Sequence, residues 1–204
     1  MRKLFLFLFM IPFFTNAQDE SKDKEVSIEE VKNIFDSLPK ENGQVRWFED
    51  ITLDSSYAKD ILNENAEAVF SRILSHGREI TRIDGKKDGK ISGIGTFNVD
   101  GGSQNTLLGH VDESRDIDFT LEILFRNGSY SFRVSEVTSI RERKTSRNSD
   151  RYQNTEFDQL TLEQAYKACS KSSSKKLERR AFYQTIQKLK YDIELLKLIM
   201  AKRV

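Results

Sequence analysis

The chain has 204 residues with a formal net charge of +1, and 37% of its residues are hydrophobic. This length predicts one domain with extensions or two small domains. Cys169 is the only cysteine, which excludes an intramolecular disulfide. We expect Cys169 to be a small buried residue on a helix, with pairing between chains as the alternative.

The first residues have the order of a secretory signal peptide. Arg2 and Lys3 give a positive start, the run from Leu4 to Phe14 is apolar, and Ala17 is a small final residue. A membrane-spanning helix needs about 20 apolar residues, so this run is too short for an anchor. We expect cleavage between Ala17 and Gln18. The mature chain is then exported, periplasmic or secreted, and has no transmembrane span.

Charge is unevenly distributed along the mature sequence. Gln18 to Ile140 holds 15 basic and 24 acidic residues, whereas Arg141 to Val204 holds 16 basic and 8 acidic residues. The basic tail either docks on the acidic part of the chain, is solvated, or meets an anionic surface or envelope partner. The exported location and the lack of stacking aromatics among the basic residues argue against nucleic acid as a partner.

Residues 18–42 form an N-terminal leader with one short helix. Ser27 and Glu30 have the spacing of a capping box, and apolar residues follow at helical intervals. Pro39 ends this helix.

The main domain is expected at residues 43–143. Val45 to Leu53 has the β-branched and aromatic content of a strand. Asp54 to Ser56 offers side-chain oxygens to cap a long helix that ends near Gly77. Shorter strands are expected at Glu79 to Ile83 and at Lys90 to Val99.

The dipeptide Asn127-Gly128 predicts a β-hairpin with a two-residue turn. Pairing Arg126 with Ser129 sets the register and sorts the side chains by face. The apolar pairs are Phe125 with Tyr130, Ile123 with Phe132, and Leu121 with Val134; the polar pairs are Glu122 with Arg133 and Thr120 with Ser135.

The stretch from Gly101 to Arg115 is polar and rich in glycine, and we expect a long loop. Long loops are often functional, which makes this one the candidate binding site. Its candidate residues are Gln104, Asn105, His110, Asp112 and Glu113.

Residues 144–160 are polar and basic and are expected to form a linker. Residues 161–204 form a C-terminal helical region, with a capping signal at Thr161 and Gln164 for a short helix that reaches Cys169. The final helix runs from Leu177 to Lys202. Its apolar stripe packs on the sheet or, as the alternative, mediates self-association. The stripe consists of Phe182, Ile186, Leu189, Ile193, Leu196 and Met200.

The elements together predict an α+β fold of order β-α-β-β-β-β-α, with an antiparallel sheet covered on one face by helix. Four elements together resemble an uncharacterised bacterial domain family with a TATA-binding-protein-like fold. They are the strand with Trp47, the helix after Ser55-Ser56, the segment Lys90 to Val99 with Gly93 and Gly95, and the hairpin Asp118 to Val137. The resemblance covers about Val45 to Arg143. Members typically follow a signal peptide, and the family implies neither an activity nor catalytic residues.

No motif for cofactor or metal chemistry is present. Asp84, Asp88 and Gly89 fit part of a calcium loop, but Lys86 replaces a ligand and Gly95 replaces the final glutamate. The two histidines and one cysteine lack zinc spacing. We therefore expect no catalytic, cofactor-binding or metal residues.

The leading functional hypothesis is a noncatalytic binding or interaction module of the bacterial envelope. The alternatives are a structural or assembly role through the C-terminal helix, and an enzyme with an unrecognised site near His110. A sequence-adjacent triad of His110, Asp112 and Ser114 is disfavoured, since the nucleophile elbow of a hydrolase is missing.

Overall fold

The computed structural model describes residues 25–74, 83–85, 89–106, 109–146, 153–172 and 175–202. The expected signal peptide, Met1 to Ala17, and its cleavage site before Gln18 lie outside these residues. So do Gly77 and most of the strand expected at Glu79 to Ile83.

Four helices and eight strands are found in the described residues. The helices are α2 (Ile28–Asp36), α3 (Lys59–Ile73), α4 (Leu162–Ser170) and α5 (Lys176–Met200). The strands are β1 (Lys40–Glu41), β2 (Gln44–Val45), β3 (Trp47–Thr52), β4 (Ile83–Gly85), β5 (Lys90–Thr106), β6 (Gly109–Arg126), β7 (Ser129–Ser146) and β8 (Gln153–Thr161).

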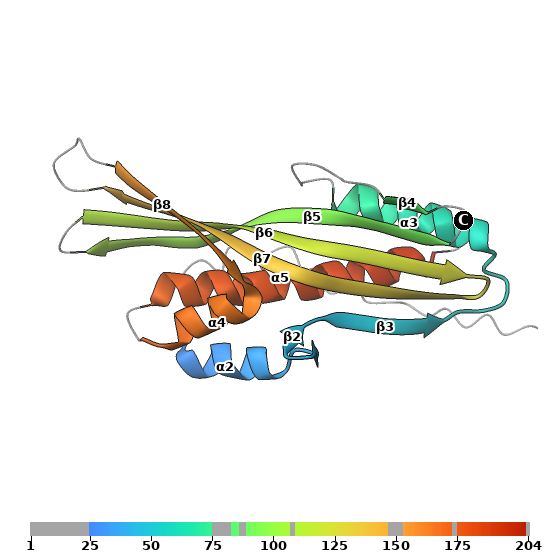
Figure 1. Cartoon of the computed structure of the whole chain (residues 1–204), viewed down its shortest axis with the longest axis horizontal. Helices are drawn as coiled ribbons and strands as arrows, with labels where there is room; N and C mark the ends of the chain where they lie inside the picture. Colours follow the sequence, from blue (N-terminus) through green and yellow to red (C-terminus); the bar gives the residue numbers. More distant parts are fainter. Residues whose placement is uncertain are drawn as a thin grey trace, which may run out of the picture.

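An antiparallel six-stranded sheet forms the body of the protein. The order is β3-β7-β6-β5-β4, and β8 also pairs with β7. Strands β3 and β8 share one edge of β7: β3 pairs with its first half and β8 with its second half. The three long strands run along the longest axis of the molecule (Figure 1).

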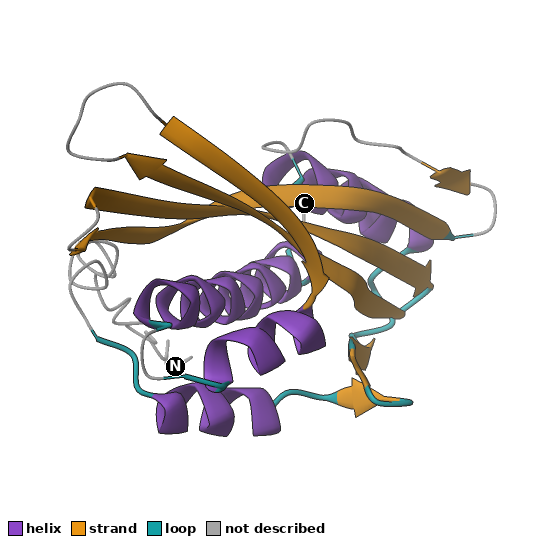
Figure 2. Ribbon diagram, turned by 60° about the vertical axis from the view of Figure 1, so that its left-hand side comes forward, coloured by secondary structure: helices purple, strands orange, loops and turns teal. Residues whose placement is uncertain are grey.

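The structure confirms the α+β class and the helix-covered antiparallel sheet. The helices lie on one side of the sheet, and the other side is uncovered by any described helix (Figure 2). Nearly all buried apolar residues belong to one cluster that extends from Val26 to Met200. The leader helix and the C-terminal helices therefore share one core with the expected main domain.

The predicted hairpin is confirmed in its register. Arg126 faces Ser129, Phe125 faces Tyr130 and Leu121 faces Val134, and the polar pairs also match. The apolar set is buried on the helix side. Burial of each apolar side chain contributes about 1.5–3 kcal/mol of transfer free energy. The hairpin therefore provides a large share of the hydrophobic stabilisation of the fold.

The prediction of a long loop from Gly101 to Arg115 is wrong. The chain continues as β5 to Thr106 and returns as β6 from Gly109, with a bulge between Asp100 and Gly102. Positive φ at Gly102 explains why glycine occupies the bulge. The strand expected at Lys90 to Val99 thus continues for seven residues beyond its predicted end.

The prediction of a linker at residues 144–160 is also wrong. Its first residues complete β7, and most of the remainder forms β8, which pairs with β7 from Thr138 opposite Thr161 onward. Hydrogen bonding along β7 holds this polar stretch in the sheet. A polar and basic composition alone therefore gave no sign of a strand.

Helix α3 begins later than expected and has a different cap. Its N-cap residue is Ala58, which makes no side-chain cap bond. The Asn127 side chain instead accepts a hydrogen bond from Lys59 N at 2.9 Å, while Asp54 forms a local turn with Ser56. The helix ends at Ile73, before Gly77.

The two glycines of β5 allow α3 to approach the sheet closely. A Cβ atom at Gly93 would lie 2.9 Å from a ring carbon of Phe70, and one at Gly95 would lie 2.4 Å from a methyl carbon of Leu74. Glycine at positions 93 and 95 therefore leaves the space that α3 occupies on the sheet. The contact fixes α3 on the same side of the sheet as α5.

The apolar stripe of α5 is part of the core. All six stripe residues are buried, with Ile193 the most exposed at 7%. Packing on the chain's own sheet is therefore correct, and self-association through these six residues is wrong because the fold already covers them. Lys197 Nζ also lies 2.7 Å from Glu49 Oε2, which joins the basic tail to an acidic strand.

Both predicted capping boxes are present. Ser27 caps α2 together with Glu30, and Thr161 caps α4 together with Gln164. Cys169 is fully buried at the end of α4, as expected. Burial raises the pKa of its thiol to about 11.

Candidate binding surface on the open face of the sheet

The sheet has a covered face, which contacts the helices, and an open face. In β6 the odd-numbered residues are buried and the even-numbered residues are half-buried or exposed, so the even ones line the open face. Four of these carry carboxylates, which we call the acidic row. The acidic row consists of Asp112, Asp116, Asp118 and Glu122.

Neighbouring strands hold the acidic row in place. Thr96 Oγ1 donates to Asp118 Oδ1 at 2.6 Å, and Asn98 Nδ2 donates to Asp116 Oδ1 at 2.9 Å. Lys90 Nζ lies 2.6 Å from Glu122 Oε2. The hydroxyl of Thr96 orients the carboxylate of Asp118 without adding a positive charge.

Three of the predicted site residues meet at the far end of the open face. His110 Nδ1 lies 2.8 Å from Asn105 Oδ1, and His110 Nε2 lies 2.9 Å from Asp112 Oδ1. Asn105 and His110 are direct cross-strand partners in β5 and β6. Both ring nitrogens of His110 therefore face side-chain oxygens of neighbouring residues.

The other two predicted residues lie on the covered side of the sheet. Gln104 pairs with Val111, one position away from Asn105, so its side chain belongs to the opposite face. Glu113 is buried among charged residues. The five candidates therefore do not form one site: the structure joins Asn105, His110 and Asp112 and separates Gln104 and Glu113 from them.

Glu113 belongs to a buried ionic cluster. Arg115 donates to Glu113 Oε1 through Nε at 3.1 Å and through Nη2 at 2.8 Å, and its side chain is 2% exposed. Burial raises the pKa of the Glu113 carboxyl, Arg115 opposes this rise, and Glu178 adds to it. Oε2 of Glu113 has no hydrogen-bond partner among the described residues.

Further contacts extend this cluster to the helices. Arg141 Nη1 lies 3.7 Å from Glu178 Oε1, and Lys175 Nζ lies 2.9 Å from the same oxygen. Arg179 donates to the carbonyl oxygens of Val26 and Ser172. These contacts join the sheet, α5 and the start of the described chain, so the cluster has a structural role.

A shallow hollow lies at the other end of the open face, beside the Asn127-Gly128 turn. Its volume is about 370 Å³. Asp50, Leu124, Arg126 and Ser131 line it, and Leu124 is 41% exposed. The hollow mixes carboxylate, guanidinium, hydroxyl and apolar groups, which suits a polar side chain of a partner.

Sequence reasoning missed the acidic row as a unit. Its signal is the spacing: Asp112, Asp116, Asp118 and Glu122 are separated by even numbers of residues, as side chains on one face of a strand must be. A loop assignment for the first part of this segment hid the pattern.

Structural comparison shows the same fold in a solved protein. The crystal structure of a DUF4468 family protein from Bacteroides ovatus ATCC 8483 aligns with a TM-score of 0.51 and 11% sequence identity, over 81% of this chain and 91% of that chain. A TBP-like protein from Parabacteroides distasonis ATCC 8503 aligns with a TM-score of 0.46 and 12% identity, over 78% of this chain and 97% of that chain.

Sequence comparison adds no relative. No family model and no curated protein matches the chain. Within the described ranges, no helix is long and apolar enough to span a membrane. Those same ranges contain no group of three or more His, Cys, Asp or Glu residues arranged to hold a metal ion.

Proposed function

We propose that the chain is an exported, noncatalytic binding module whose recognition surface is the open face of the sheet. The observation that carries this proposal is the acidic row on the central strand β6, displayed on a face that no described helix covers. A partner with basic side chains complements this row. The mixed hollow near Asp50 offers a second point of contact on the same face.

The charge on this face also argues against nucleic acid. Carboxylates on the central strand repel phosphate groups, which nucleic-acid binders neutralise with lysine and arginine. Lys90 and Arg133 lie beside or opposite Glu122 at one end of the face, and Lys144 lies opposite Asp112 at the other end, so the middle of the row has no basic cross-strand neighbour. A fold shared with a TBP-like protein therefore does not carry DNA binding to this chain, since function depends on the site.

Export is part of the proposal and rests on the residues from Met1 to Ala17. Expression of the full chain in a Gram-negative host should place it in the periplasmic fraction, with Gln18 as the first residue by N-terminal sequencing. The double variant Arg2→Glu with Lys3→Glu should stay in the cytoplasm, because its signal peptide lacks the positively charged start. A cytoplasmic full-length wild-type chain contradicts this part of the proposal.

Binding is tested by charge removal on the acidic row. We expect Asp112→Asn, Asp116→Asn and Asp118→Asn combined to reduce partner capture from envelope extracts at least tenfold, measured with the tagged mature chain and quantitative mass spectrometry. A matched control carries Glu29→Gln, Asp60→Asn and Glu64→Gln, three exposed acids on helices. Equal capture by both variants contradicts the proposal.

A further inference from the structure

The outer edge of β3 is open to pairing. Among the described strands β3 is hydrogen bonded to β7 alone. Leu53 N donates to Gly128 O at 2.8 Å, which places position 53 on the β7 side of the ladder. Backbone groups alternate sides along an antiparallel strand. Phe48, Asp50 and Thr52 therefore direct their N–H and C=O groups away from the sheet.

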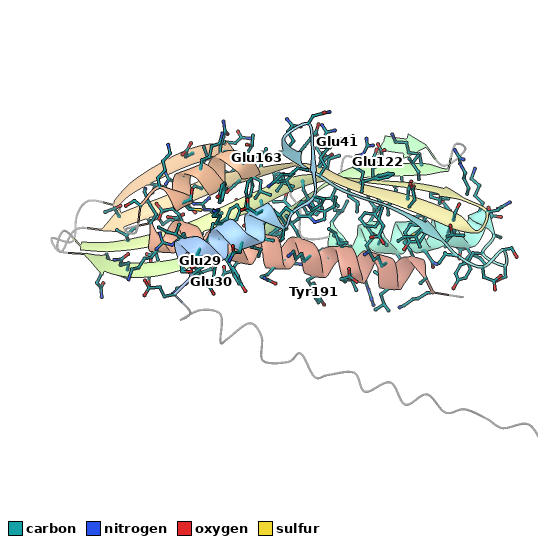
Figure 3. All side chains as sticks on the ribbon, turned by 90° about the horizontal axis from the view of Figure 1, so that it is seen from below. Glu29, Glu30, Glu41, Glu122, Glu163 and Tyr191 are labelled. Carbon is teal, nitrogen blue, oxygen red and sulfur yellow. The ribbon has the colours of Figure 1, made fainter. Side chains whose placement is uncertain are left out.

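A groove runs beside this edge on the covered face. Its volume is about 450 Å³, and it separates β3 from the second half of α5. Trp47, Phe132 and Ile193 form its apolar base and are at most 8% exposed. The ion pair between Glu49 and Lys197 also lines the groove and joins β3 to α5 across it. Tyr191 does not line the groove and projects from α5 into solvent, away from the sheet (Figure 3). A strand added to β3 would place alternate side chains over this groove.

The charges of β3 argue against a second copy of the chain as the occupant. Consider β3 paired antiparallel with β3 of a second copy. Two registers join the most residues: one places Asp50 opposite Asp50, and the other places Glu49 opposite Glu49. Like charges directly opposite destabilise a strand pair. The edge therefore favours a partner whose residue opposite Asp50 is basic.

We propose that the outer edge of β3 binds an extended segment of a partner protein by strand addition, with basic residues on the open face and apolar residues over the groove. Lysine or arginine on the added strand pairs with Asp50 and lies near the ring of Phe48, which is 54% exposed. The intervening apolar side chains lie over the groove, beside the aliphatic part of Lys197 and the exposed edge of Trp47. Main-chain bonds provide affinity, and the alternation provides selectivity.

This surface contains no residue of the acidic row, and it shares Asp50 with the hollow at the end of the open face. Its test uses a defined probe and the purified mature chain. The probe is acetyl-KVKFKVK-amide, which alternates lysine with apolar residues. Trp47 is the only tryptophan and lines the groove, so its fluorescence reports binding. We expect the amides of Phe48, Asp50 and Thr52 to exchange more slowly in the complex, as measured by NMR.

Two control peptides separate main-chain from charge recognition. The same peptide N-methylated at its lysine amides keeps the side chains but blocks the bonding edge, and acetyl-EVEFEVE-amide reverses the charge. Both should bind at least tenfold more weakly than the probe. Equal binding of either control, or unchanged exchange at the three amides with the probe bound, overturns the proposal.

Charge reversal in the protein completes the test. Asp50→Lys should weaken probe binding about fivefold to tenfold at low salt, whereas Glu64→Lys on α3 should leave it unchanged. Both positions are exposed, so both variants should fold. Protection of the same amides that rises with protein concentration and needs no peptide would identify a second copy as the occupant and overturn the proposal. These outcomes do not depend on the acidic row.

Discussion

The covered face of the sheet has two halves that bury different chemistry. Near the Asn127-Gly128 turn, which we call the apolar half, β6 and β7 place Leu121, Phe125 and Phe132 against α3 and α5. Toward the other end, which we call the charged half, β6 places Glu113 and Arg115 under the helices.

The two halves should respond differently to substitution. In the apolar half each side chain contributes through transfer from water and through close packing, so loss of volume is costly. In the charged half each ion depends on its partner, because an unpaired buried charge is strongly unfavourable. Removal of one ion and removal of a whole pair are therefore different experiments.

Phe125→Ala tests the apolar half and should have the largest effect. The side chain is 2% exposed and faces Tyr130 in the hairpin. We expect a loss of about 3–5 kcal/mol in the free energy of unfolding, from urea titration followed by circular dichroism. Phe48→Ala is the matched control on an exposed site and should cost less than about 1 kcal/mol. Similar losses for both variants would show that this half is not tightly packed.

Arg115→Met tests the charged half. It leaves the Glu113 carboxyl buried without its hydrogen-bond donor, and we expect a loss of about 3 kcal/mol by the same urea titration. The double variant Glu113→Leu with Arg115→Met removes both ions. It should regain most of the lost stability, because replacing a whole buried pair by apolar residues is often nearly neutral.

The comparison between single and double variants decides the point. A double variant that is no more stable than Arg115→Met would show that Ser139, Arg141 and Glu178 depend on the pair for their own positions. The charged half would then act as one network, and the pair would not be separable from it.

The raised pKa of Glu113 makes the charged half sensitive to pH. The folded chain holds the proton more tightly than the unfolded chain, whose carboxyl has the ordinary value of 4.5. This stabilising contribution is complete below 4.5 and is lost as the pH rises through the folded pKa. Glu113→Gln does not titrate, so wild type should lose stability relative to this variant as the pH rises from 4.5 to 8.

Thermal unfolding at several pH values measures this difference. Glu64→Gln removes an exposed carboxylate from α3 and controls for the general loss of charge. A wild-type chain that gains stability relative to Glu113→Gln over the same range would mean that Arg115 lowers the Glu113 pKa by more than burial raises it.

The same contrast explains what the sequence could predict. The hairpin from Leu121 to Val134 alternates apolar and polar residues and contains Asn127-Gly128, so both its existence and its register follow from local rules. The stripe of α5 was equally readable. In both cases one face of the element meets an apolar neighbour, and the hydrophobic period shows it.

In the charged half that period disappears. Glu113 and Arg115 occupy the buried positions of β6, so a segment that is a strand reads as a polar loop. Strand β8 was missed for a related reason: its stretch is polar and basic, and only β7 beside it shows that it is extended. The candidate site inherited this error, because Gln104 and Glu113 were grouped with residues of the opposite face.

Thr161→Ala tests how much the N-terminal cap of α4 stabilises the helix that covers the charged half. We expect this substitution to have the smallest effect on the free energy of unfolding. Thr161 ends β8 and begins α4, where its hydroxyl accepts a hydrogen bond from Gln164 N at 3.3 Å. We expect a loss of about 1 kcal/mol in urea titration, since the alanine leaves an N-terminal amide of α4 without its acceptor. Thr161→Ser keeps the oxygen and should restore the stability. Equal losses for the alanine and serine variants would show that packing of the Thr161 methyl group, and not the cap, holds α4 over the ionic cluster.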